Sequence, residues 1–120
     1  MNGIKTRFET PHYQESIAFY STHLGLKIIQ SWDNGLDKGT ILGLHDSENG
    51  EAFLEIANRI TPISYEGLSI QLRVPKLVDI INKIDGVLDF RGPVLRPWGS
   101  TYLYLRDPSG IQVILYEGRL

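Results

Sequence analysis

The chain of 120 residues has a formal net charge of −2, so it offers no basic field to attract nucleic acid. No apolar run approaches the roughly 20 residues of a membrane-spanning helix, and Met1–Phe8 lacks the apolar core of a signal peptide. Cysteine is absent, which excludes disulfides and thiolate chemistry and is in keeping with a cytoplasmic location. We expect a single domain over 1–120 that binds neither nucleic acid nor membrane.

The first half of the chain predicts the order βαβββ. Ile4–Phe8 alternates as a strand that ends at Thr10-Pro11, and residues 13–24 carry an apolar stripe at helical spacing, with Gly25 as the stop. Three more strands are expected at 27–32, 40–45 and 51–57, with turn residues at 33–35, 37–39 and 46–50.

The same order returns after a predicted linker at 58–66. It comprises a strand at 68–74, a helix at 76–84 closed by Gly86, a strand at 87–91, a break at Gly92-Pro93 and a hairpin of 101–106 with 111–117. Asp107-Pro-Ser-Gly110 between the hairpin strands has the residues that a type I turn prefers. Two βαβββ units, about 1–60 and 65–120, therefore form an internal repeat.

Alternation in the hairpin separates a core face from a face suited to holding a ligand. The core face comprises Leu103, Leu105, Val113 and Leu115. The other face comprises Tyr102, Tyr104, Gln112, Ile114 and Tyr116, which are large, aromatic and partly polar.

Two motifs within this repeat resemble a known family. Phe19-Tyr20-Ser-Thr-His-Leu24-Gly25-Leu26 and Asp107-Pro-Ser-Gly110 with its apolar strand are similar to the vicinal oxygen chelate superfamily. That superfamily includes glyoxalase-type lyases, bleomycin-resistance proteins, fosfomycin-resistance enzymes and extradiol dioxygenases. The resemblance covers nearly the whole chain. It implies an α+β fold of two tandem βαβββ units whose curled sheets enclose a cleft, and a homodimer that closes its clefts across a two-fold axis.

The resemblance also implies where a divalent metal would bind. In metal-dependent members, His, Glu or Gln on the first and fourth strands of each unit hold the ion. Those positions fall on Lys5, Glu55, Ser69 and Ile114, of which only Glu55 is a good ligand. We therefore expect no metal and no other cofactor. Lys5 and Glu55 are either an ion pair in place of the ion or two separately solvated groups.

The histidines offer an alternative metal site. His12, His23 and His45 are not spaced four residues apart on one helix face, and we interpret them as solvated or locally hydrogen-bonded side chains.

The candidate ligand-binding residues are those expected to face the cleft. They are Lys5, Arg7, Trp32, Phe53, Glu55, Ser69, Arg73, Trp98, Tyr102, Tyr104 and Tyr116. The aromatic residues either stack a planar ligand or fill the core or a dimer interface. Arg7 and Arg73 either bind an anionic group of the ligand or are neutralised by Glu9, Glu51 or Glu55. Glu66 and Arg96 are interpreted as ordinary surface loop residues.

Three functions remain open from the sequence. The first is a metal-independent small-molecule binding protein resembling bleomycin-resistance proteins. The second is a glyoxalase-like lyase or dioxygenase that uses a divalent metal, or Glu55 as a general base. The third is a module with a vestigial cleft that binds a partner.

Overall fold

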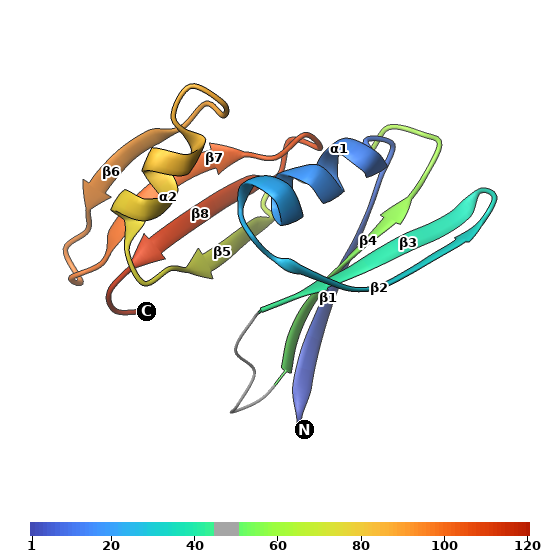
Figure 1. Ribbon diagram of the computed structural model, residues 1–120, viewed down its shortest axis with the longest axis horizontal. Coiled ribbons are helices and arrows are strands. Elements are labelled where there is room, and N and C mark those ends of the chain that lie inside the picture. Colours follow the sequence, from blue (N-terminus) through green and yellow to red (C-terminus); the bar gives the residue numbers. More distant parts are fainter. Residues whose placement is uncertain (45–50) are drawn as a thin grey trace. The chain divides into compact units, whose positions relative to one another are not determined.

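The computed structural model describes residues 1–44 and 51–120. The chain divides into two compact units, Met1–Ile63 and Ser64–Leu120, with the boundary inside the stretch predicted as a linker. Each unit has a four-stranded mixed sheet and one helical segment (Figure 1), which confirms the α+β class of two tandem βαβββ units. That the sheets enclose a cleft stays a prediction. No helix in the described part of the chain is long and apolar enough to cross a membrane.

The first unit follows the predicted order. Its elements are β1 (Gly3–Thr10), α1 (Tyr13–Ala18), η1 (Phe19–His23), β2 (Lys27–Asn34), β3 (Asp37–Gly43) and β4 (Glu51–Asn58). The sheet order is β1-β4-β3-β2, with β1 parallel to β4 and the other pairs antiparallel. The core lies on the helical side, where Phe8, Tyr20, Leu42 and Ile56 are buried.

The predicted helix over 13–24 exists, but its last turn is wider than an α-helix. Residues 19–23 form a π-helical turn in which the Leu24 amide donates to the Phe19 carbonyl at 3.0 Å. Gly25 ends it with φ of 84°, a conformation that glycine adopts without steric cost. The buried residues of this helical segment are Tyr13, Ser16, Phe19, Tyr20 and Leu24.

The turn predicted at 37–39 is wrong, because these residues belong to β3. The connection between β2 and β3 is shorter and consists of Gly35 and Leu36. Gly39 pairs with Trp32 and Ala57 within the sheet, and the ring of Trp32 occupies the space that a Cβ at this position would take. The strand predicted at 40–45 ends at Gly43, and its last residue, His45, lies outside the described residues, as does the turn predicted at 46–50.

The second unit repeats the topology. Its elements are β5 (Ser69–Arg73), α2 (Leu77–Ile84), β6 (Arg91–Leu95), β7 (Thr101–Arg106) and β8 (Gln112–Glu117). The sheet order is β5-β8-β7-β6, with β5 parallel to β8. The predicted core face of the hairpin is confirmed, since Leu103, Leu105, Val113 and Leu115 are all buried.

The strand predicted at 87–91 is wrong. The carbonyl of Ile84 accepts hydrogen bonds from the amides of Val87 and Leu88, so these residues continue the turn that ends α2. The strand β6 instead begins at Arg91 and runs through Gly92-Pro93, a cis peptide bond that had been predicted as a break. The pairing shifts between Arg91 and Val94, and β6 is an edge strand, where a proline is tolerated.

The turn at 107–110 forms as predicted. Oδ1 of the buried Asp107 accepts hydrogen bonds from the amides of Ser109 and Ile111, both at 2.9 Å. The Gly110 amide donates to the Asp107 carbonyl at 3.0 Å, and Gly110 has φ of 89°. This turn fixes the register that pairs Tyr102 with Tyr116 and Tyr104 with Ile114.

Candidate ligand-binding site

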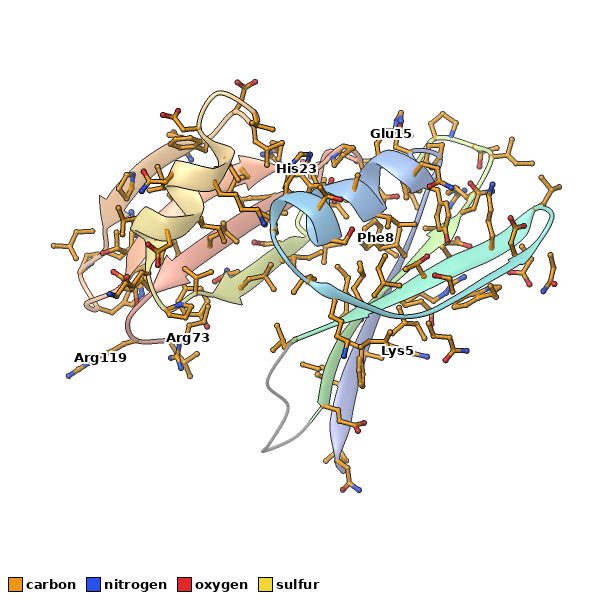
Figure 2. All side chains as sticks on the ribbon, viewed as in Figure 1. Lys5, Phe8, Glu15, His23, Arg73 and Arg119 are labelled. Carbon is orange, nitrogen blue, oxygen red and sulfur yellow. The ribbon has the colours of Figure 1, made fainter. Side chains whose placement is uncertain are left out.

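In the first unit, Glu55 is held between two cations. Glu55 on β4 is only 7% exposed, and its Oε1 lies 3.1 Å from Nζ of Lys5. Its Oε2 accepts a hydrogen bond from Nε of Arg7 at 2.8 Å. Figure 2 labels both residues of β1: Phe8 lies close to the helix, whereas Lys5 lies farther from it along the strand. Of the two alternatives for Lys5 and Glu55, the ion pair is therefore the one that forms.

Arg7 is paired with carboxylates of its own sheet. Besides Glu55, Arg7 has Glu9 as a partner, with Nη2 at 3.5 Å from Oε2. Arg59 also contacts Glu9, at 3.6 Å. Arg7 is therefore paired with two carboxylates. Of the two alternatives for this residue, neutralisation by acidic side chains is the one that the structure shows.

Trp32 and Phe53 occupy the same face of the first sheet as Glu55. The register pairs Trp32 with Gly39 and Phe53 with both Lys5 and Gly43. Trp32 is half-buried, and its indole Nε1 donates to Oδ1 of Asp37 at 3.3 Å. A side chain with its ring flat on the sheet and its N–H bonded locally is anchored, so Trp32 has a structural role on this face.

In the second unit, four aromatic side chains gather on the sheet face opposite the core. The ring of Tyr102 is the centre, with centroid distances of 5.6 Å to Trp98, 5.9 Å to Tyr104 and 6.0 Å to Tyr116. We refer to Trp98, Tyr102, Tyr104 and Tyr116 as the aromatic face. The three tyrosines are half-buried and Trp98 is 44% exposed, so the rings present surface to solvent instead of filling the core.

Arginines lie against the outer rings of the aromatic face. The guanidinium of Arg91 lies 4.6 Å from the ring centroid of Tyr104, and that of Arg73 lies 5.7 Å from the ring centroid of Tyr116. Each pair consists of direct cross-strand neighbours in the register. In Figure 2 the Arg73 side chain extends away from the sheet at the end of β5.

Arg96 is not the ordinary loop residue that the sequence suggested. Its guanidinium lies 5.0 Å from the ring centroid of Trp98, and its Nε is buried with no hydrogen-bond partner among the described residues. Arg96 therefore packs against Trp98, whose ring meets that of Tyr102 at an interplanar angle of 76°.

Two candidate positions contribute little polar chemistry to this face. Ile114 on β8 pairs with Tyr104 on β7, is 5% exposed and has no donor atom. Ser69 at the start of β5 has a buried hydroxyl that finds no hydrogen-bond partner in residues 1–44 and 51–120.

Further residues of this face were not among the predicted site residues. Arg91 was assigned to a strand that does not form, and its place beside Tyr104 depends on the Gly92-Pro93 bulge. Gln71 alternates with Ile70 and Leu72 in the predicted strand 68–74 and so shares a face with Ser69 and Arg73, and its Oε1 lies 3.5 Å from the Tyr102 hydroxyl. Alternation was the available signal for Gln71, whereas no sequence signal placed Arg91.

An open hollow of about 600 Å³ adjoins the aromatic face in the second unit. It is lined by Leu88, Asp89, Phe90, Arg91, Tyr104, Leu105, Arg106 and Gln112. Tyr104 belongs to both features and Arg91 lies against its ring, so the hollow continues the aromatic face at its β6 side. A volume of this size is within the usual range for small-molecule sites, about 300–1,000 Å³.

The donor set does not fit a divalent ion at the position implied by the resemblance. Within either unit, the only carboxylate at those positions is Glu55, whose two oxygens each contact a cation. No group of three His, Asp or Glu side chains in the described residues is arranged to hold a metal. His12 contacts Glu15 at 3.3 Å and His23 is half-buried in η1, while His45 lies outside the described residues.

Two tandem βαβββ units, each with an open sheet face opposite its helix, define a class of α+β proteins that is built by repetition. The chain belongs to the Glyoxalase/Bleomycin resistance protein/Dioxygenase superfamily, whose sequence profile matches residues 6–115. The match confirms the resemblance found in the sequence motifs. No curated protein sequence matches the chain.

Solved structures share the fold along almost the whole chain. A bleomycin resistance determinant encoded on the transposon Tn5 is 21% identical, with a TM-score of 0.73 and 100% of both chains covered. The antibiotic-binding protein TnmS3 from a Streptomyces species is 14% identical, with a TM-score of 0.73 over 97% of this chain and 96% of that one. Lactoylglutathione lyase from Agrobacterium tumefaciens is 15% identical, with a TM-score of 0.70 over 96% and 92%. At these identities the likeness shows the fold alone.

Proposed function

We propose that this chain is a small-molecule binding protein that holds its ligand on the aromatic face without a metal ion. The observation that carries the proposal is the position of Tyr102, whose ring is surrounded by Trp98, Tyr104 and Tyr116 and is still half-exposed. Exposed aromatic surface beside a hollow of about 600 Å³ is typical of a site for a planar ligand. The printed names of two fold relatives, a bleomycin resistance determinant and an antibiotic-binding protein, agree with it.

The metal-free part of the proposal is supported by Glu55. To ligate an ion, this carboxylate must give up its contact with Lys5 or with Arg7. Bringing a divalent cation to the same place also sets three positive groups against one carboxylate, which is electrostatically unfavourable. Lys5 and Glu55 occupy two of the four positions at which the family resemblance implies metal ligands, and here they pair with each other.

The competing proposal is an enzyme in which Glu55 acts as a general base. A base must be within hydrogen-bond reach of the substrate proton that it takes. Both oxygens of Glu55 already contact cations, Nζ of Lys5 and Nε of Arg7, so neither oxygen is free to face a substrate. The pair with Lys5 and Arg7 therefore favours a structural role for Glu55 over catalysis.

The experiment is a calorimetric titration of metal-free protein with 2-naphthamide, a neutral planar probe. We expect binding that weakens at least about tenfold in Tyr102→Leu, because stacking on the central ring is lost, and that persists in Tyr102→Phe, which keeps the ring. Lys83→Gln on the exposed side of α2 is the control for a surface substitution. Equal affinities in Tyr102→Leu and the parent, or binding only after a divalent metal is added, contradicts the proposal. The homodimer and the cytoplasmic location stay predictions from the sequence.

A further inference from the structure

Three arginines of the second unit differ from Arg7 in having no acidic partner among the residues that the structure describes. No carboxylate of the described residues lies within ion-pair distance of Arg73, Arg91 or Arg106. Arg106 donates to the Gly110 carbonyl at 3.1 Å, which leaves its charge uncompensated. The aromatic face is therefore bordered by guanidinium groups whose positive charge is available to a ligand.

These arginines border the aromatic face on both sides. The sheet order β5-β8-β7-β6 puts Arg73 on one edge strand and Arg91 on the other, with the tyrosines on the two strands between them. Each guanidinium rests on the ring beside it, which costs little side-chain freedom because the planar group is already oriented. Oriented guanidinium groups of this kind suit bidentate hydrogen bonds to carboxylate or phosphate oxygens.

Three of the four rings of the aromatic face already have a guanidinium against them. Cations bind over aromatic rings through the negative face of the π system. Arg91, Arg73 and Arg96 already lie against Tyr104, Tyr116 and Trp98, respectively. On these three rings a cationic ligand would have to displace an arginine or lie beside it, so the positive charge around Tyr102 disfavours a cation.

The hollow beside Tyr104 supplies a place for a negative group. Its lining includes Arg91, Arg106 and Gln112, whose side chains carry hydrogen-bond donors, and a single carboxylate, Asp89. Two positive groups against one negative group leave a net attraction for an anion. Tyr104 and Arg91 join the hollow to the aromatic face, so one molecule can contact both.

On this basis we propose that the ligand is a planar organic anion, with its ring system on the aromatic face and its acidic group in the hollow beside Arg91 and Arg106. This inference rests on the proposed function and adds the charge of the ligand to it. A carboxylate, a sulfonate and a phosphate share the required chemistry, namely a negative group with several acceptor oxygens attached to a flat apolar body.

The test uses three probes with one ring system and different charge, namely 2-naphthoate, 2-naphthamide and 2-naphthylmethylammonium. Calorimetry at fixed ionic strength should give about tenfold tighter binding of 2-naphthoate than of 2-naphthamide, and the weakest binding for the ammonium probe. In Arg91→Gln the advantage of 2-naphthoate over 2-naphthamide should fall to about threefold or less, while Lys83→Gln should keep it. Arg91→Lys, which retains charge but loses the planar fork, should lie between the two.

The outcomes separate this inference from the proposed function. If 2-naphthamide binds as tightly as 2-naphthoate, and Tyr102→Leu weakens both, the binding face stands and the anionic ligand is wrong. An unchanged preference for 2-naphthoate in Arg91→Gln also overturns the inference, because the charge then acts elsewhere. If none of the three probes binds, or if Tyr102→Leu binds them as the parent does, the proposed function itself is wrong.

Discussion

Glu55 and Lys5 form an ion pair across the parallel strands β1 and β4, with 3.1 Å between Oε1 and Nζ. The carboxylate is nearly buried while the lysine side chain is half-exposed, so water screens the pair only in part. Replacing both residues should therefore reveal a favourable coupling. The double-mutant cycle of Lys5→Met and Glu55→Gln should give about 1 kcal/mol of interaction free energy in urea unfolding.

The coupling between Lys5 and Glu55 should decrease in high salt, since its exposed end is screened. Lys27→Met, an exposed lysine at the start of β2, serves as the matched control and should change the unfolding free energy little. Additive single-mutant effects, within about 0.3 kcal/mol, would show that the two groups act independently.

Gly39 should be more sensitive to a methyl group than Gly43. A Cβ at Gly39 overlaps the ring of Trp32, whereas one at Gly43 meets only the side-chain ends of Ile29 and Phe53 at 3.2 Å. Gly39→Ala should lower the free energy of unfolding by about 1–3 kcal/mol and change the fluorescence of Trp32. The measurement uses a Trp98→Phe background so that Trp32 is the sole tryptophan. A larger loss in Gly43→Ala, with unchanged Trp32 emission in Gly39→Ala, is the opposite result.

Asp107 should stabilise the hairpin mainly through Oδ1. Asp107→Ala leaves the amides of Ser109 and Ile111 without this acceptor and should lower the free energy of unfolding by about 2–3 kcal/mol. Asp107→Asn retains an acceptor oxygen and should cost less than half as much. Equal losses in both variants, measured by urea unfolding, would assign the effect to the charge instead of the hydrogen bonds.

The homodimer implied by the family resemblance is open to a direct test. Sedimentation velocity at concentrations on the order of 10 micromolar should give a mass of two chains, as expected for an interface with a dissociation constant well below this. A single species with the mass of one chain at that concentration contradicts the prediction.

The repeat of βαβββ units was predictable because its signals are local. Alternation and helical spacing gave every strand of the first unit and the hairpin of the second, and Asp107 with Gly110 gave the turn between β7 and β8. The errors arose where tertiary contacts override local preference. Glycine is common in turns, but Gly39 lies in a strand and is covered by the ring of Trp32. The Gly92-Pro93 sequence predicts a break in the strand, but in the structure it forms a bulge in an edge strand.

The sequence predicted which tyrosines share the candidate site, but it did not predict how the arginines are arranged around them. Alternation placed Tyr102, Tyr104 and Tyr116 on one face, and the structure brings their rings together. The arginines were harder, because whether a guanidinium meets a carboxylate or a ring depends on neighbours from other strands. Arg7 meets Glu55, whereas Arg91 reaches Tyr104 only through the shifted register of β6.

The central claim, a metal-independent binding site, is tested most directly by measuring metal content and ligand affinity on the same sample. The protein is incubated with Zn²⁺, Ni²⁺, Mn²⁺ or Fe²⁺, desalted, analysed for metal and titrated with 2-naphthamide. The account predicts almost no retained metal and the same dissociation constant as in protein treated with EDTA. One retained ion per chain that is lost in Glu55→Gln, together with binding that requires the ion, would contradict it and favour a metal-dependent lyase or dioxygenase.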